Sequence, residues 1–245
     1  MEIECLEKNI NINKNLPDFN PEDAIDRFKS IINRPDIGFF NIVEDSTLCK
    51  DAVSLYQKFS HKKHFIHVGI GGSSLGPEML INSLSKQDVQ FTFINNIDPD
   101  VIKQQLDTIT NIEESLFYIV SKSGGTAETM AVLSIILKLL ENDFSISAEL
   151  LKNYVVFCTD PLKGDLRELA INLNINYLTI PPNIGGRFSV LTNVGIFPAL
   201  FAKISFEKIL NGAQDMGKSI LLDSHSENPL GKTIDFLLRH TLNNC

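Results

Sequence analysis

Five short apolar runs that alternate with helix-like stretches constrain the fold of this chain more than any other feature. The runs are rich in β-branched and aromatic residues, which is typical of buried strands. Because strands that alternate with helices pair in parallel and are covered on both faces, the pattern predicts an α/β fold, a three-layer αβα arrangement around a five-stranded parallel sheet. The expected strands cover residues 65–69, 91–94, 116–120, 154–158 and 177–180.

Helices are expected before, between and after these strands. Asn20 and Pro21 are residue types preferred at a helix start, and Pro35 ends that first element. The pattern continues beyond the last strand, so the sheet domain is followed by further helices. The predicted helices cover residues 20–34, 48–59, 77–84, 98–109, 130–140, 165–173, 190–204, 206–222 and 228–240.

The turn after the third strand, SKSGGTAET at residues 121–129, is the strongest candidate for a ligand site. Its glycines let the backbone approach a ligand closely, and the following helix presents free N–H groups and the positive end of its dipole. Together with the hydroxyls of Ser121, Ser123 and Thr126, these groups suit a dianion such as a phosphate ester. The alternative is an ordinary helix start, in which Thr126 only caps the helix.

A second turn, GIGGSSLG at residues 69–76, follows the first strand. It lacks the third glycine of a dinucleotide-binding fingerprint, because Ser74 stands at that position. Ligands of parallel sheets bind beyond the carboxyl ends of the strands, where both turns lie. The two turns therefore fit one phosphate, with Ser73 on one side and the hydroxyls of residues 121–126 on the other. Lys122 contributes either its backbone N–H, which we favour, or only a solvated side chain.

A third polar turn follows the fifth strand and contains Arg187, preceded by Gly185 and Gly186. An arginine so placed can reach the same crevice, where a fixed guanidinium stabilises a developing oxyanion by ~3 kcal/mol or more. The alternatives are an ordinary surface arginine and a partner of a helix C-cap. By contrast, His67 lies inside a strand and is expected to be a core histidine rather than a base.

Charge and cysteine content argue against several classes of protein. The net charge of −8 speaks against a general binder of nucleic acid or anionic membranes, so neither is expected as a partner. The four cysteines are far apart and show no metal-ligand or disulfide spacing, and Cys158 is expected in a buried strand. The N-terminus has no apolar signal core and no apolar run reaches transmembrane length, so the sequence predicts a cytoplasmic protein without metal or cofactor.

Three motifs, in this order, resemble the glucose-6-phosphate isomerase family in its shorter bacterial form. The motifs are GIGGSSLGP at 69–77, SKSGGTAET at 121–129 and GGRFS at 185–189. The resemblance covers the chain from about residue 35 to its end. It implies an N-terminal helical segment at 1–44, a first sugar isomerase (SIS) domain at 45–185, and a helical segment at 186–245 that leads to a second SIS domain.

The same resemblance implies a reaction and a site. The reaction is the interconversion of glucose 6-phosphate and fructose 6-phosphate, in glycolysis and gluconeogenesis, with a hexose 6-phosphate as partner. Arg187 lies at the reacting carbons, where it steadies a cis-enediolate. The resulting substrate-binding set is Gly72, Ser73, Ser121, Lys122, Ser123, Thr126 and Gly186.

The sequence also departs from the family. Members continue into a second SIS domain with a glutamate base, a histidine and a lysine, for which we find no counterpart here. The chain therefore looks like the N-terminal part of an isomerase: a fragment, a truncated gene product or a recombinant piece. We expect it to bind hexose phosphates weakly and to turn them over poorly or not at all. Family members dimerise, so a homodimer is an open alternative.

Two other functions fit part of the pattern. A non-catalytic SIS module that binds a sugar phosphate needs the phosphate turn but no cation at the carbon end, so the GGRFS motif speaks against it. Another SIS enzyme, such as an arabinose-5-phosphate or glucosamine-6-phosphate isomerase, is disfavoured by the helices before the sheet and by the first glycine-rich turn.

Overall fold

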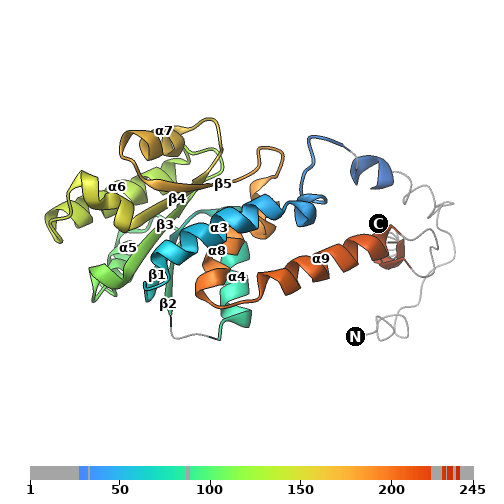
Figure 1. Ribbon diagram of the computed structural model, residues 1–245, viewed down its shortest axis with the longest axis horizontal. Helices are drawn as coiled ribbons and strands as arrows, with labels where there is room; N and C mark the ends of the chain where they lie inside the picture. The colour runs from blue at the N-terminus through green and yellow to red at the C-terminus, as the bar shows by residue number, and fades with distance from the viewer. Residues whose placement is uncertain are drawn as a thin grey trace, which may run out of the picture. The chain divides into compact units, whose positions relative to one another are not determined.

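The computed structural model contains the predicted sheet, five parallel strands in the order β2-β1-β3-β4-β5 (Figure 1). The sheet places Val68 of β1 opposite both Ile94 of β2 and Ile119 of β3. The three inner strands are buried along their whole length, as their apolar sequences require. The strands are β1 (His64–Val68), β2 (Gln90–Ile94), β3 (Ser115–Val120), β4 (Val155–Thr159) and β5 (Asn176–Thr179), each within one residue of its predicted bounds.

The structure describes residues 28–32, 34–86, 89–221, 228–229, 231–233 and 236–237. They belong to two units, one formed by Pro35–Asn211 and the other by the described parts of Met1–Arg34 and Gly212–Cys245. Most of the helix predicted at 20–34 and much of the helix predicted at 228–240 lie outside the described residues; residues 28–32 and 231–233 are helical. The sheet and all three predicted turns belong to the unit Pro35–Asn211.

Helices cover both faces of the sheet and form the predicted three layers (Figure 1). Side chains alternate along each strand, so that Tyr118 of β3 faces one helical layer while Phe117 and Ile119 face the other. The first layer contains α3 (Ser46–Phe59), α4 (Leu75–Leu84) and α8 (Asn193–Phe201). The second contains α5 (Pro99–Leu106), α6 (Ala127–Asn142) and α7 (Asp165–Asn172). Helix α9 (Phe206–Ile220) follows α8 in the chain.

Short 3-10 helices occupy several of the connections. Two of them contribute to the candidate site: η2 (Gly71–Ser73), after β1, and η5 (Gly186–Leu191), after β5. The others are η1 (Ile42–Glu44), η3 (Ile112–Glu114) and η4 (Ala148–Asn153).

The helix predicted at 190–204 is wrong in its first part. Residues Gly186–Leu191 form η5, and α8 begins only at Asn193. The break lies at Thr192, whose backbone is extended and whose hydroxyl accepts a hydrogen bond from the Val194 amide at 3.3 Å. Asn193 then ties the start of α8 to the sheet, because its side-chain amide donates to the Thr179 carbonyl at 2.9 Å. Arg187 therefore lies on a separate element ahead of α8.

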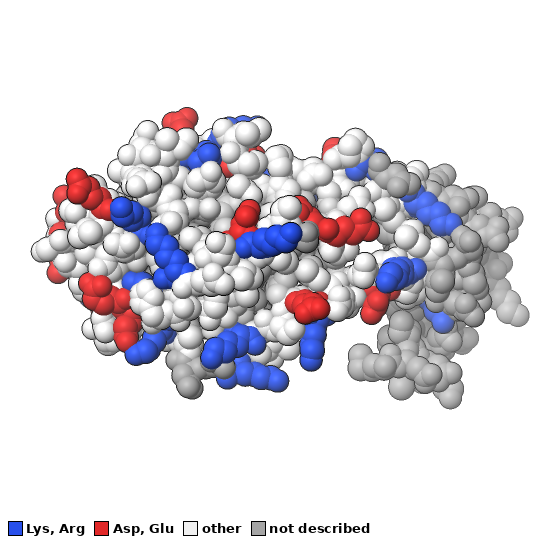
Figure 2. Space-filling model, in the orientation of Figure 1, with Lys and Arg blue, Asp and Glu red and all other residues white. Residues whose placement is uncertain are grey.

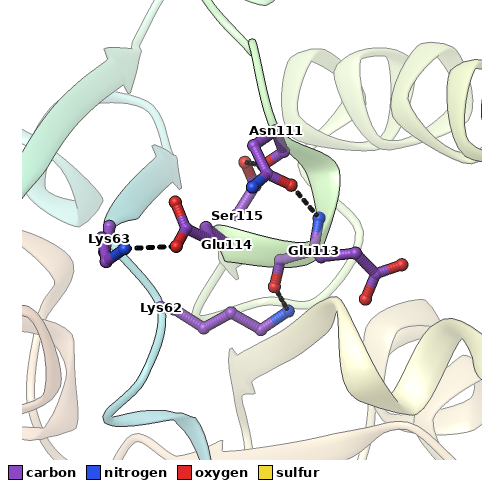
Figure 3. Close-up of polar contacts among 6 residues, drawn as sticks. All are labelled: Lys62, Lys63, Asn111, Glu113, Glu114 and Ser115. Atoms are coloured by element: carbon purple, nitrogen blue, oxygen red, sulfur yellow. Dashed lines mark hydrogen bonds and ion pairs between the residues drawn. The ribbon is translucent and has the colours of Figure 1, made fainter.

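A network of charged and polar groups fixes the amino ends of β1 and β3, at the opposite edge of the sheet from the candidate turns (Figure 3). Lys62 is only 4% exposed; its ammonium donates to the Glu113 carbonyl at 2.8 Å and lies 4.6 Å from the centre of the Tyr154 ring. Burial lowers the pKa of Lys62, and the Glu113 carboxylate opposes that shift. Lys63 pairs with Glu114 beside it. These contacts hold the strand starts in register.

Three features of the structure concern binding to charged partners, membranes and metals. On the face drawn in Figure 2, Lys and Arg side chains lie interspersed with Asp and Glu side chains. No helix within the described ranges is long and apolar enough to cross a membrane. Among the same residues, no three His, Cys, Asp or Glu side chains gather as a metal-ligand set.

Candidate functional site

Three hydroxyl groups gather in the turn between β3 and α6. The Ser121 hydroxyl lies 2.8 Å from that of Thr126 and 3.4 Å from that of Ser123, and the Ser123 and Thr126 oxygens are 3.3 Å apart. Ser121 is buried, while Ser123 is exposed, so the cluster extends from the end of the strand to the surface. A hydroxyl can rotate its proton toward whichever acceptor is present. The cluster can therefore turn donors toward an anion.

The alternative role of Thr126 as the N-cap residue is confirmed in its position but not in its side-chain hydrogen bond. Thr126 occupies the N-cap position of α6, with φ −61° and ψ 116°, but its hydroxyl forms no capping hydrogen bond. That hydroxyl is directed to Ser121 instead. The first amides of a helix lack partners within the helix, and the dipole of a 16-residue helix adds partial positive charge there. The start of α6 thus combines hydroxyl donors with an electrostatically favourable position for an anion.

A glycine that the sequence reasoning did not single out supports this turn. Gly164, just before α7, has φ +101°, and a Cβ at this position would lie 2.3 Å from the Ser123 carbonyl oxygen. Gly124 has φ +73°, and a Cβ there would lie 3.0 Å from the Gly164 Cα. The Leu166 amide also donates to the Gly124 carbonyl at 3.0 Å. The two turns cross at their glycines, so the backbone of the hydroxyl turn rests on the start of α7.

The turn after β1 packs directly against the element that carries Arg187. A Cβ on Gly72 would lie 2.4 Å from the carbonyl carbon of Gly186 and 2.5 Å from the Arg187 amide nitrogen. The Ser189 hydroxyl donates to the Gly186 carbonyl at 2.6 Å and lies 3.4 Å from the Gly72 carbonyl oxygen. Glycine at position 72 is therefore required by the contact of two backbones. The structure brings Gly72, Gly186 and Arg187 together, while their roles toward a ligand stay predictions.

Ser73 is held by a buried histidine on the preceding strand. The Nε2 atom of His67 lies 2.7 Å from the Ser73 carbonyl oxygen, and because a carbonyl only accepts, Nε2 carries the proton. Burial lowers the pKa of His67 to about 4, although the bond to Ser73 opposes the shift. The prediction of a core histidine is confirmed. Within the described residues, the Ser73 hydroxyl forms no hydrogen bond with the Ser121–Thr126 cluster.

Lys122 does not have a freely solvated side chain. Its ammonium donates to the Pro182 carbonyl at 2.8 Å, so this alternative from the sequence is wrong. Pro182 belongs to the loop between β5 and η5. The suggested role of the Lys122 backbone N–H stays a prediction.

Arg187 presents an exposed side chain at the start of η5. Its guanidinium carbon lies 5.6 Å from the centre of the Phe188 ring, and that ring stacks on Phe39 at 4.5 Å between ring centres. In the described part of the chain, no carboxylate lies within ion-pair distance of Arg187. The side chain is anchored at its base by the η2–η5 contact and remains available to a ligand at its tip.

The strand order places these turns on either side of one point of the sheet. The chain places β2 on one side of β1 and β3 on the other, so the order of the sheet reverses between β1 and β3. In open parallel sheets, the turns that leave such a pair of strands diverge and open a crevice at the carboxyl ends. The turns that carry Ser73 and the Ser121–Thr126 cluster follow these two strands.

A separate open hollow of about 610 Å³ lies along the edge strand β5, next to α3. Its walls include Asp51, Lys58 and Asn176, and the Lys58 ammonium donates to the Asn176 side chain at 3.2 Å. It contains none of the predicted site residues. Its presence therefore does not alter the assignment of the site to the carboxyl ends of β1 and β3.

The fold and its turns define an α/β domain with hydroxyl- and glycine-rich turns at the carboxyl edge of a five-stranded parallel sheet. The sequence model of the phosphoglucose isomerase family matches residues 55–238, and the chain belongs to that family.

Individual relatives agree with this assignment. The chain is 35% identical over 212 residues to a glucose-6-phosphate isomerase of Carboxydothermus hydrogenoformans, a match that covers 80% of this chain and 44% of the relative. A hypothetical protein of Thermus thermophilus has a similar structure, with a TM-score of 0.81, 30% identity, and coverage of 89% of this chain and 52% of that one. A glucose-6-phosphate isomerase of Chlamydia trachomatis gives a TM-score of 0.65 and 25% identity, over 90% and 39% of the two chains. The chain thus spans about half the length of the curated relatives it matches.

Proposed function

We propose that this chain supplies the phosphate site and the oxyanion arginine of an enzyme that interconverts glucose 6-phosphate and fructose 6-phosphate. The observation that carries the proposal is the cluster of Ser121, Ser123 and Thr126 hydroxyls at the start of α6, in a chain of the phosphoglucose isomerase family. The names of the relatives support the reaction class.

The phosphate end of the substrate would be bound by the hydroxyl cluster. A phosphate dianion has three strong acceptor oxygens, and it replaces the hydroxyl-to-hydroxyl contacts by charge-assisted hydrogen bonds. The N-terminal dipole of α6 adds favourable electrostatics. Ser73, on the neighbouring turn after β1, would close the site from the other side. Binding the phosphate, which is remote from the reacting carbons, orients the sugar for the proton transfer.

Arg187 would act at the carbon end. Moving a proton between C1 and C2 produces a cis-enediolate, whose developing oxyanion needs a fixed cation. The Gly72–Gly186 contact fixes the backbone of Arg187, while its guanidinium stays exposed. The reaction also needs a carboxylate base near C1 and C2. We assign no residue of this chain to that base; the chain spans about half the length of the relatives it matches.

Two assays test the proposal. A coupled assay of fructose 6-phosphate conversion should give little or no turnover with this chain and with Arg187→Ala, because general acid–base catalysis worth about 10²–10⁴-fold is missing. Binding of 6-phosphogluconate, measured by calorimetry, should be detectable at millimolar concentration and weaken about tenfold or more in Ser121→Ala, since a hydrogen bond to a charged group is lost.

Ser134→Ala is a matched control for the binding assay. Ser134 lies further along α6, is exposed, and donates its hydroxyl to the Met130 carbonyl of the same helix at 2.9 Å. Its removal should leave binding unchanged. Turnover at a rate near that of full-length relatives would contradict the proposal that this chain contributes the phosphate site and Arg187 without a base, and absence of 6-phosphogluconate binding would contradict the phosphate site.

A further inference from the structure

The Lys122 side chain joins two loops that are far apart in the sequence. Lys122 lies between Ser121 and Ser123 in the hydroxyl turn after β3, and its ammonium donates to the Pro182 carbonyl at 2.8 Å. Pro182 lies in the loop after β5, five positions before Arg187. Because β4 separates β3 from β5 in the sheet, the lysine crosses over the end of one strand to reach this loop.

The loop that carries Pro182 is held on its other side by residues that precede α3. The Gly38 amide donates to the Asn183 carbonyl at 2.9 Å, and the Asn183 side-chain amide donates to the Pro35 carbonyl at 3.2 Å. Phe188 stacks on Phe39, with 4.5 Å between ring centres. These contacts attach the loop to the segment 35–39 but not to the hydroxyl turn. The Lys122–Pro182 hydrogen bond makes that second connection.

The spacing of the two turns matters for a sugar phosphate. Its phosphate group and its C1 and C2 oxygens are separated by a fixed number of covalent bonds, so the phosphate turn and Arg187 must stand at a matching distance. A misplacement of about 1 Å in such an arrangement can cost about 10²-fold in rate. An ammonium donating to a neutral carbonyl is a charge-assisted hydrogen bond and can hold this distance in a half-exposed position.

We infer that Lys122 is a positioning residue whose side chain ties the loop 180–185, which leads into η5, to the hydroxyl turn and so sets the distance between the bound phosphate and Arg187. This inference rests on the proposed function. It gives the Lys122 ammonium a role at the carbon end of the substrate, although the residue lies within the phosphate turn. It also distinguishes Lys122 from a direct phosphate ligand, which would act on any phosphate.

The test compares two ligands by calorimetry or by competition. Inorganic phosphate reports only on the phosphate turn, whereas 6-phosphogluconate adds a carboxylate at the carbon end that can meet Arg187. Lys122→Met keeps the length of the side chain and removes the donor; Lys122→Arg keeps a donor. Lys103→Met is the control, because Lys103 lies on α5 and its ammonium pairs with the exposed Asp107 just after that helix.

The expected result is selective. Lys122→Met should bind 6-phosphogluconate about tenfold more weakly, as expected for the loss of one charge-assisted bond, and bind inorganic phosphate within about twofold of the parent chain. Lys122→Arg should restore most of the affinity for 6-phosphogluconate. In a double-mutant cycle, Lys122→Met combined with Arg187→Ala should be no weaker than Arg187→Ala alone, because both changes remove the same contact.

Three results would overturn the inference. If Lys122→Met weakened the binding of both ligands equally, Lys122 would be a direct phosphate ligand. If it changed neither affinity, the bond to Pro182 would be irrelevant to binding. If the losses in the double mutant were additive, Lys122 would act independently of Arg187. If the parent chain bound neither ligand, the proposed function would fail first and the inference with it.

Discussion

The close contact between Gly72 and the Gly186–Arg187 peptide predicts that Gly72→Ala destabilises the protein and displaces η5. The added Cβ would lie 2.4 Å from the Gly186 carbonyl carbon, whereas ordinary contacts begin near 3.4 Å, so the two backbones must separate by about 1 Å. All three nearest atoms belong to the backbone, which has no rotamer to relieve the overlap.

The magnitude follows from two opposing effects. Overpacking of this kind costs about 1–3 kcal/mol, while replacing a glycine lowers the entropy of the unfolded chain and stabilises by about 0.4–1 kcal/mol. The net expectation for Gly72→Ala is a loss of about 1–2 kcal/mol in the free energy of unfolding. Gly186, on the other side of the same contact, has no positive φ, and a Cβ there would meet nothing within 4 Å. Gly186→Ala should therefore be neutral or stabilising by about 0.4–1 kcal/mol.

Urea denaturation followed by circular dichroism measures both variants, with the m-value as a check that the same surface unfolds. The opposite signs of the two effects are the informative result, because a general intolerance of alanine in glycine turns would destabilise both. A Gly72→Ala variant as stable as the parent chain, or a Gly186→Ala variant equally destabilised, would refute the contact between η2 and η5.

Three further predictions concern His67, Gly164 and Cys158. Burial lowers the pKa of His67 from 6.5 to about 4, so between pH 6.5 and 4 the unfolded chain binds a proton that the folded chain does not. The free energy of unfolding should therefore fall by up to about 3 kcal/mol as the pH drops from 6.5 to 4. This pH dependence should be smaller in His67→Gln. An NMR titration that protonates the folded His67 ring near pH 6.5 would contradict this. Gly164→Ala should lower the free energy of unfolding by about 1–3 kcal/mol, because its Cβ would lie 2.3 Å from the Ser123 carbonyl oxygen and the backbone there has φ +101°. Urea denaturation measures this loss, and unchanged stability would count against the crossing of the two turns. Burial raises the pKa of Cys158 to about 12, so iodoacetamide at pH 8 should modify Cys49, which is half-buried, well before Cys158, and equal rates by mass spectrometry would contradict the burial of β4.

The sheet could be predicted because its signal is local and repeated. Each strand is a short β-branched or aromatic run, as in Leu116–Val120, and burial on both faces requires such a run to be continuous. The hydroxyl cluster was predictable for a similar reason. Ser121, Ser123 and Thr126 lie within six positions of one turn, so any tight strand-to-helix connection brings them together.

The remaining features depend on contacts between distant parts of the chain. The separation of η5 from α8 reflects the Thr192 cap and the packing of Gly72 against Gly186, which apolar periodicity does not report. The bond from Lys122 to Pro182 joins residues 60 positions apart. Gly164 could have been noticed as a glycine directly before a helix. The reason for a glycine at this position is its close contact with Gly124, which the sequence does not show.

The central claim is that the hydroxyl turn binds the phosphate of a sugar phosphate while Arg187 meets its carbon end. A titration of the ¹⁵N-labelled chain with glucose 6-phosphate, and in parallel with glucose, tests it most directly. The account predicts that millimolar glucose 6-phosphate shifts the amide signals of residues 121–127 and 186–187, that glucose shifts neither group, and that Ser121→Ala loses the response. Equal shifts with both sugars, or shifts confined to other parts of the chain, would contradict it.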